Sequence, residues 1–179
     1  SGNEDTPDLV AFIGWEWTQA GPTPETHYGH HNVIFKDYKE GKIPDRPIAA
    51  GGALANILRT QLADVNRNLF LLDPLNRDYY WSFADYLDAI LSTPNCEEGI
   101  PSNYLPKDCY ESATTPGELY AKLDDWGFDV EVIPHGTTWG FYTPQAASWK
   151  EYTNTPDNIR PDYNSLVEIY SGHGNSEVF

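Results

Sequence analysis

Three histidines gather in one short stretch of the chain, at positions 27, 30 and 31. Clusters of imidazoles suit zinc, manganese or iron, which bind neutral ring nitrogens. His30 and His31 are neighbours, so in a strand their side chains point to opposite faces, and at most one of them faces a given site. We therefore expect one of this pair to be a metal ligand, with His27 as a further candidate.

Two other candidate ligands lie in or after apolar segments. Glu16 stands in Gly-Trp-Glu-Trp, where a carboxylate costs free energy unless it is paired, hydrogen-bonded or bound to a metal. His135 follows the apolar run Val-Glu-Val-Ile-Pro. Taken singly, such an acid is more often solvated and such a histidine more often structural. Together, a carboxylate and imidazoles can hold divalent ions, which lower the pKa of bound water and make hydroxide available near neutral pH.

Other catalytic signatures are missing from the sequence. It contains no Gly-x-Ser-x-Gly turn for a serine nucleophile and no Gly-x-x-x-x-Gly-Lys or Gly-x-Gly-x-x-Gly loop for phosphates. Serine catalysis and nucleotide binding therefore have little support.

The elements that must position these residues are read from hydrophobic patterning. Residues 9–17 predict a buried strand that ends near Glu16, residues 31–36 a second strand, and residues 129–134 a strand that delivers His135 at its end. A further strand is predicted over 166–170, with Glu168 inside it. Strands alternating with helices predict an α/β fold with a largely parallel sheet, whose ligands gather at the carboxyl ends of the strands.

Three helical segments are predicted between the strands. Residues 53–66 are ambiguous, with leucines at helical spacing, while residues 82–91 follow a cap-like Ser82. Residues 116–126 have stronger signals, since Thr115 is an N-cap candidate, a proline follows it, and Gly127 ends the segment.

Cys96 and Cys109 bracket a loop rich in Gly, Pro, Ser and Asn. An even count around a loop predicts a disulfide and, with it, an extracytoplasmic location; two free thiols in a reducing cytosol are the alternative. Neither cysteine lies in a Cys-x-x-Cys pair, so a zinc role is not expected.

The charge balance narrows the range of partners. With 27 acidic and 11 basic side chains the formal net charge is −16, which repels nucleic-acid phosphates and anionic lipids. No segment approaches the roughly 20 apolar residues of a membrane span. We expect a small-molecule substrate, and the sequence leaves the oligomeric state open.

Four blocks carry a resemblance: GWEWTQ, GHHNVIF, VIPHGTTWGFYTP and LVEIYSGHGNSE. They look like successive blocks of a widespread bacterial family of unassigned function, related to the PHP (polymerase and histidinol phosphatase) superfamily. The resemblance implies part of a distorted β/α barrel with peripheral helices that holds two or three divalent metal ions. Its ligand pattern falls on Glu16, His30 and His135, and His30 is preferred to His31 because it stands two residues before an asparagine. His173 and His27 are weaker ligand candidates, and Thr137 or Thr138 would contact the substrate.

The chain also departs from the superfamily pattern. An early His-x-His strand and a late Asp-x-His strand are both missing. We therefore expect residues 1–179 to be the central portion of a single PHP-like domain that continues beyond both ends, and the full metal complement to need the longer protein.

These observations predict a metal-dependent hydrolase, by analogy a phosphoesterase, that uses metal-activated water in the bacterial periplasm or outside the cell. One alternative is a secreted aromatic-rich domain that binds carbohydrate or peptide without catalysis. Another is an inert fragment derived from an enzyme. Metal that survives dialysis separates the hydrolase from the binding domain.

Overall fold

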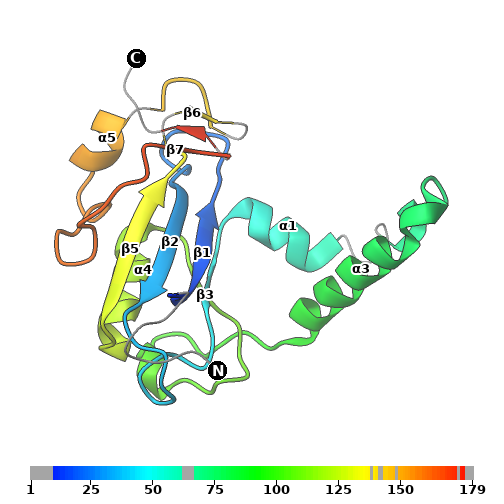
Figure 1. Cartoon of the computed structure of the whole chain (residues 1–179), viewed down its shortest axis with the longest axis horizontal. Helices are drawn as coiled ribbons and strands as arrows, with labels where there is room; N and C mark the ends of the chain where they lie inside the picture. Colours follow the sequence, from blue (N-terminus) through cyan, green and yellow to red (C-terminus); the bar gives the residue numbers. More distant parts are fainter. Residues whose placement is uncertain are drawn as a thin grey trace.

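A computed structural model describes residues 10–61, 67–137, 139–140, 143–147, 149–172 and 174–175. Its centre is a three-stranded sheet of β1 (Ile13–Gln19), β2 (Gly29–Phe35) and β5 (Val130–His135), in the order β1-β2-β5 (Figure 1). Both pairings are antiparallel, so the middle strand β2 runs against its two neighbours.

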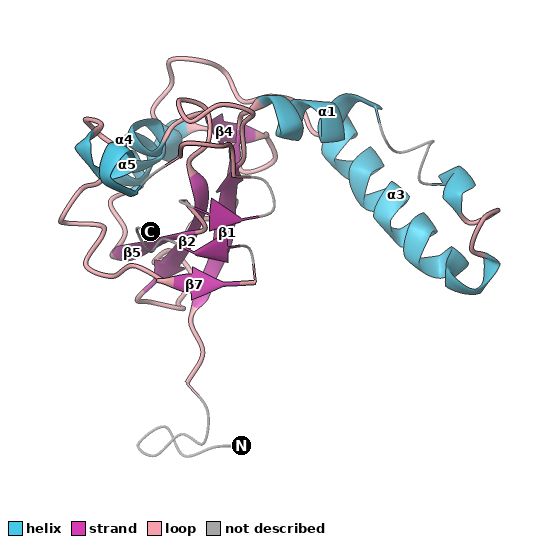
Figure 2. Ribbon diagram, turned by 90° about the horizontal axis from the view of Figure 1, so that it is seen from above, coloured by secondary structure: helices cyan, strands magenta, loops and turns pink. Residues whose placement is uncertain are grey.

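Strict alternation along these strands gives the sheet an apolar and a polar face. Trp15, Trp17, Val33 and Val132 share one face, because Trp15 is paired with Val33, and Val33 with Val132. Helix α4 (Pro116–Trp126) packs on that face with its leucines, and Figure 2 shows the helix to one side of the strands. This layer between sheet and helix is the core of the domain.

Helix α4 begins and ends as its sequence predicts. The Thr115 hydroxyl accepts a hydrogen bond from the backbone N–H of Glu118 at 3.2 Å, which satisfies one of the free donors of the first turn. Gly127 ends the helix in a left-handed conformation, with φ of 66°.

Smaller elements surround this centre. Strands β3 (Ile48–Ala50) and β4 (Glu111–Ala113) form a parallel pair, and the indole N–H of Trp15 donates to the Ile48 carbonyl beside β1. The remaining short elements are the 3₁₀ helix η2 (Ser102–Tyr104), α5 (Trp149–Asn154), and the antiparallel strands β6 (Trp139–Gly140), β7 (Tyr170–Ser171) and β8 (Gly174–Asn175).

A helical arm projects away from the sheet (Figures 1 and 2). It consists of α1 (Ala53–Gln61), the 3₁₀ helix η1 (Pro74–Asn76) and the long helix α3 (Arg77–Ser92). No helix in the described part of the chain is long and apolar enough to cross a membrane.

The predicted fold class is wrong. The main sheet is antiparallel instead of largely parallel, and no barrel closes among the described residues. The alternation of strands and helices predicted parallel crossovers, but β1 and β2 are joined by residues 20–28, where a segment of turn residues reverses the chain. A parallel pair would need a crossover of a dozen or more residues, so this short connection favours an antiparallel pair.

The individual helices and strands were predicted more accurately than the topology. The helix predicted over 116–126 is confirmed, and the strands predicted over 31–36 and 129–134 are present with shifts of one or two residues. The ambiguous segment 53–66 is helical over Ala53–Gln61, and residues 62–66 lie outside the described part.

Three boundaries were wrong. Glu16 lies inside β1 and not at its end, because the strand continues to Gln19. Helix α3 begins at Arg77, after the proline of η1 starts the turn, so Ser82 is no cap. The strand predicted over 166–170 is absent except for Tyr170, since this segment follows the edge of β5 with isolated hydrogen bonds instead of a ladder.

The predicted disulfide between Cys96 and Cys109 is present, with the Cα atoms 4.9 Å apart. Replacing both cysteines by serine removes a cross-link over 13 residues and should lower the free energy of unfolding by about 3 kcal/mol, chiefly by freeing the unfolded chain. Urea unfolding of the oxidised protein and of the double variant measures the difference. Reductant should destabilise the native chain and leave the variant unchanged; equal stability of all samples would contradict a stabilising role.

Candidate metal site

The polar face of the sheet carries a row of side chains across all three strands. His30 in β2 is paired with Thr18 in β1 on one side and with His135 in β5 on the other. Directly opposed residues of antiparallel strands hold their Cβ atoms roughly 5 Å apart, so the three side chains must meet. The two imidazole rings lie nearly parallel, with centroids 5.1 Å apart. The strand register thus creates the histidine pair.

A glycine allows this close pairing. Gly29 precedes His30 with φ of 67°, and a Cβ atom there would lie 2.7 Å from the carbonyl oxygen of His135. Both its left-handed conformation and the nearby backbone exclude a side chain at this position. The approach of β2 to the end of β5 therefore depends on Gly29.

Glu16 joins the histidine pair from β1. It lies two residues before Thr18, hence on the same face, and its Oε1 is 2.6 Å from Nδ1 of His30. The Thr18 hydroxyl donates to the same Oε1 at 3.1 Å and lies 3.0 Å from Nδ1 of His30. Thr18 therefore holds the carboxylate and the imidazole against each other.

His135 is accompanied by a second carboxylate. Oε2 of Glu168 lies 3.6 Å from Nδ1 of His135, and the backbone N–H of Glu168 donates to the Pro134 carbonyl at 3.1 Å. Metal-bound histidines commonly present their other ring nitrogen to such a carboxylate, which fixes the ring orientation. The sequence analysis did not single out Glu168 or Thr18 as site residues. For Glu168 the available signal was an acid within the apolar run of 166–170.

The geometry of this cluster fits a divalent metal. Glu16, His30 and His135 each offer one ligand atom, and these atoms lie within 4.8 Å of one another. Two ligand atoms of a tetrahedral zinc ion are about 3.3 Å apart, so side-chain rotations would have to bring these atoms closer together. One carboxylate and two imidazoles also form a donor set suited to zinc, manganese or iron.

The electrostatics of Glu16 favour its charged form. Burial raises the pKa of this carboxyl group, but the hydrogen bonds to Thr18 and His30 and the charges of His30 and His135 together lower it by more. Glu16 is therefore ionised at neutral pH and available as an anionic ligand.

His31 points to the opposite face, as its position in a strand predicted. It is fully buried, meets the Trp17 ring edge-on at 5.2 Å, and places Nε2 2.5 Å from the Tyr152 hydroxyl. Its Nδ1 has no hydrogen-bond partner among the described residues, so a protonated ring would bury an unpaired donor. Burial, and then the charges of His135 and His30, lower the pKa of His31 to about 3. This histidine is a neutral part of the core.

His27 is near the cluster but is not one of its three members. It is buried, and its Nε2 lies 3.4 Å from the Gly136 carbonyl oxygen. Burial lowers the pKa of His27, and the Gly136 carbonyl offsets part of that effect. Of the other predicted site residues, Thr137 is buried, while His173 and Thr138 lie outside the described part of the chain.

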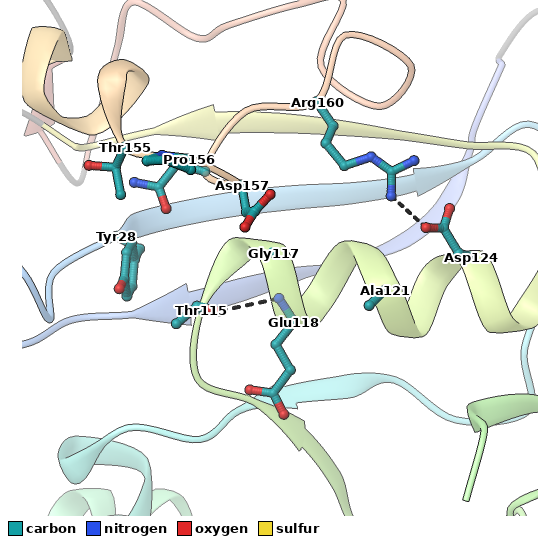
Figure 3. Close-up of a pocket in the computed structure, with 11 residues that line it drawn as sticks. Tyr28, Thr115, Gly117, Glu118, Ala121, Asp124, Thr155, Pro156, Asp157 and Arg160 are labelled. Carbon is teal, nitrogen blue, oxygen red and sulfur yellow. Dashed lines mark hydrogen bonds and ion pairs between the residues drawn. The ribbon is translucent and has the colours of Figure 1, made fainter. Parts of the chain in front are cut away.

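Two adjoining pockets lie beyond the end of β5. The smaller, of about 150 Å³, is lined by His27, Thr137 and Tyr152 among others. The larger, of about 440 Å³, lies between the start of α4 and residues 155–160 (Figure 3), where Arg160 is paired with Asp124. The two share the lining residues Tyr28, Thr155 and Asn158 and so form one recess. Glu16, His30 and His135 do not line it.

The buried His31 should make the fold sensitive to acid. Its pKa is about 3 when folded and about 6.5 when unfolded, so its neutral form stabilises the fold fully above pH 6.5, and that stability is lost as the pH falls toward 3. We expect the native chain to lose about 1.4 kcal/mol more per pH unit between pH 6 and 4 than the His31→Gln variant.

Urea unfolding of both proteins at several pH values measures this difference. The comparison uses only the slope of the unfolding free energy with pH, so it still applies if the variant is less stable at every pH. Identical slopes would show that His31 is not held neutral in the fold.

No family model, no curated protein and no solved structure matches this chain. Its function must therefore be argued from the arrangement of its own residues.

Proposed function

We propose that this chain carries a divalent-metal site formed by Glu16, His30 and His135, and that it serves a metal-dependent hydrolase. The observation that carries the proposal is their convergence from three different strands onto one face, with ligand atoms within 4.8 Å. These are the same three residues that the sequence blocks singled out before any geometry was considered. A purely structural role for the two buried imidazoles and the acid would explain less well why the sequence blocks and the geometry select the same three residues.

The residues of the chain have distinct parts in this proposal. Glu16 supplies a negative charge, Thr18 fixes its carboxylate, and Glu168 orients His135 from behind. A bound divalent ion would supply a Lewis acid and lower the pKa of a water molecule for attack. The three donors are enough for one ion, and the second or third ion expected from the family resemblance would need further ligands.

A phosphoester is the substrate class that we propose. Its support is the resemblance of the sequence blocks; the recess at Thr137 is lined by none of the three proposed ligands. The charge of −16 would repel an anionic substrate, so a bound cation would also be needed to attract the phosphate. The disulfide supports a location outside the cytoplasm, where a bacterial periplasm or the extracellular space keeps such bonds oxidised.

The alternative of an aromatic-rich carbohydrate- or peptide-binding domain has weaker support. Trp17 is fully buried and Trp15 packs against the core, so neither offers a stacking surface. Both indoles also donate hydrogen bonds to backbone carbonyls of β3. These aromatic side chains serve packing.

Replacing His135 by Ala should remove a ligand and weaken zinc or manganese binding by more than about 100-fold, because losing a ligand costs more affinity than losing a residue that only orients one. Titration of the dialysed protein with each metal, followed by calorimetry and elemental analysis, measures the affinity and the stoichiometry. His27→Ala is the matched control, a buried histidine outside the cluster, and it should bind metal as the native chain does. Unchanged binding by His135→Ala would refute the site.

Replacing Glu168 by Gln should keep the site but loosen His135, lowering metal affinity by about 10- to 100-fold without changing the stoichiometry. The same metal titration measures the affinity and the stoichiometry of this variant. Asp129→Asn, which changes a well-exposed carboxylate on the same chain, is the control. If Glu168→Gln binds as tightly as the native chain, Glu168 does not orient His135.

A further inference from the structure

A cavity of about 510 Å³ lies apart from the candidate metal site, at the other end of the sheet. Its walls come from three places: residues 40–46 after β2, residues 102–107 inside the disulfide loop, and Trp126 and Phe128 between α4 and β5. His30 lies at the start of β2 and His135 at the end of β5, so the strands separate the two sites along their length. The volume is in the range of pockets that bind small molecules.

A buried charge cluster lies beside this cavity and includes Arg46, one of its lining residues. The Arg46 side chain is 9% exposed, and its Nη2 donates to the Glu111 carboxylate at 2.6 Å. Lys122 donates to the same carboxylate at 3.3 Å, and the Glu111 side chain is 2% exposed. One carboxylate thus serves two cationic side chains, so the cluster has one positive charge that it does not itself compensate.

The guanidinium of Arg46 also has donors to spare. Its hydrogen bonds to Glu111 and to the Ser102 carbonyl both leave from Nη2. Its Nε is buried and has no partner among the described residues, which costs free energy. The nearest other acid, Asp125, accepts the Ser102 N–H at 3.0 Å but is exposed to water. A further carboxylate is the group that a guanidinium fork fits best.

The rest of the cavity favours an apolar ligand body with a single negative charge. Its apolar walls are half-buried and are formed by Ile43, Leu105, Trp126 and Phe128. Arg46 lies over the Trp126 ring, 5.7 Å from its centroid, so the charge and the aromatic surface are neighbours. The exposed rim carries two acids and one lysine: Glu40, Asp45 and Lys107. The two rim acids would repel a dianion such as a phosphate monoester.

We propose that this cavity binds a small monocarboxylic acid with an apolar body, whose carboxylate pairs with Arg46 and whose body packs on Trp126 and Phe128. Such a ligand would supply the missing negative charge and accept hydrogen bonds from the guanidinium. The disulfide loop and the Arg46–Ser102 bond hold two walls together, so the site is formed before the ligand arrives.

Calorimetric titration of the chelator-treated chain with 3-phenylpropionate tests the proposal. We expect one site with a dissociation constant on the order of a millimolar, as for a ligand of this size. The amide 3-phenylpropionamide has nearly the same shape without the charge and should bind at least about tenfold more weakly. Equal binding of acid and amide, or tighter binding of inorganic phosphate, would overturn the proposal, as would an acid that does not bind at several times the expected constant.

Three variants test where the acid binds. Arg46→Gln should weaken its binding by at least about tenfold, while Lys36→Gln, which removes the same charge from a side chain 66% exposed, should not. Asn103→Trp should block the cavity from its exposed rim without touching the buried cluster. Circular dichroism checks the fold of each protein, because Arg46→Gln also removes a partner of Glu111.

Asn103→Trp decides the question even if Arg46→Gln does not fold. Unchanged affinity in Asn103→Trp, or in a folded Arg46→Gln, would overturn the assignment to this cavity. His135→Ala should bind the acid as the native chain does. A loss of binding in His135→Ala alone would move the carboxylate to the metal cluster and refute the proposal.

Discussion

The register of β2 between β1 and β5 is the constraint on which the candidate site depends. Because β2 runs against both neighbours, its first residues meet the end of β5 and the second half of β1. A slip of one residue would turn His30 into the core and bring His31 to the polar face. Gly29, whose place no side chain could take beside the His135 carbonyl, helps to keep this register.

The two faces of the sheet differ in their side chains: one packs into the core, and the other carries the cluster of Glu16, His30 and His135. On one face Trp17, Val33 and His31 pack against α4 and Tyr152, and His31 stays neutral because it is fully buried. On the other face an ionised Glu16 holds His30 at hydrogen-bond distance. Adjacent histidines thus have opposite roles, which the pleat of a strand imposes on any such pair. The same alternation explains why a compact apolar core and a polar cluster coexist in strands of six or seven residues.

The body of the domain and the arm differ in how much apolar surface they bury. In the body, Trp17, Leu119 and Val132 are almost fully buried between the sheet and α4. In the arm, α3 buries Ala84 and Leu87, while Tyr79 and Tyr86 are 70% and 59% exposed. The arm extends away from the sheet that carries the candidate site (Figure 1).

The sequence by itself determined the local features. The caps at Thr115 and Gly127, the disulfide and the opposite faces of His30 and His31 all follow from residue type and short-range spacing, and the structure confirms each of them. Only the tertiary structure decided the antiparallel sheet, the position of Glu16 within its strand and the approach of Glu168 to His135. Strand direction and contacts between distant segments depend on how the whole chain closes around one core, and periodicity within a segment carries no information about that closure.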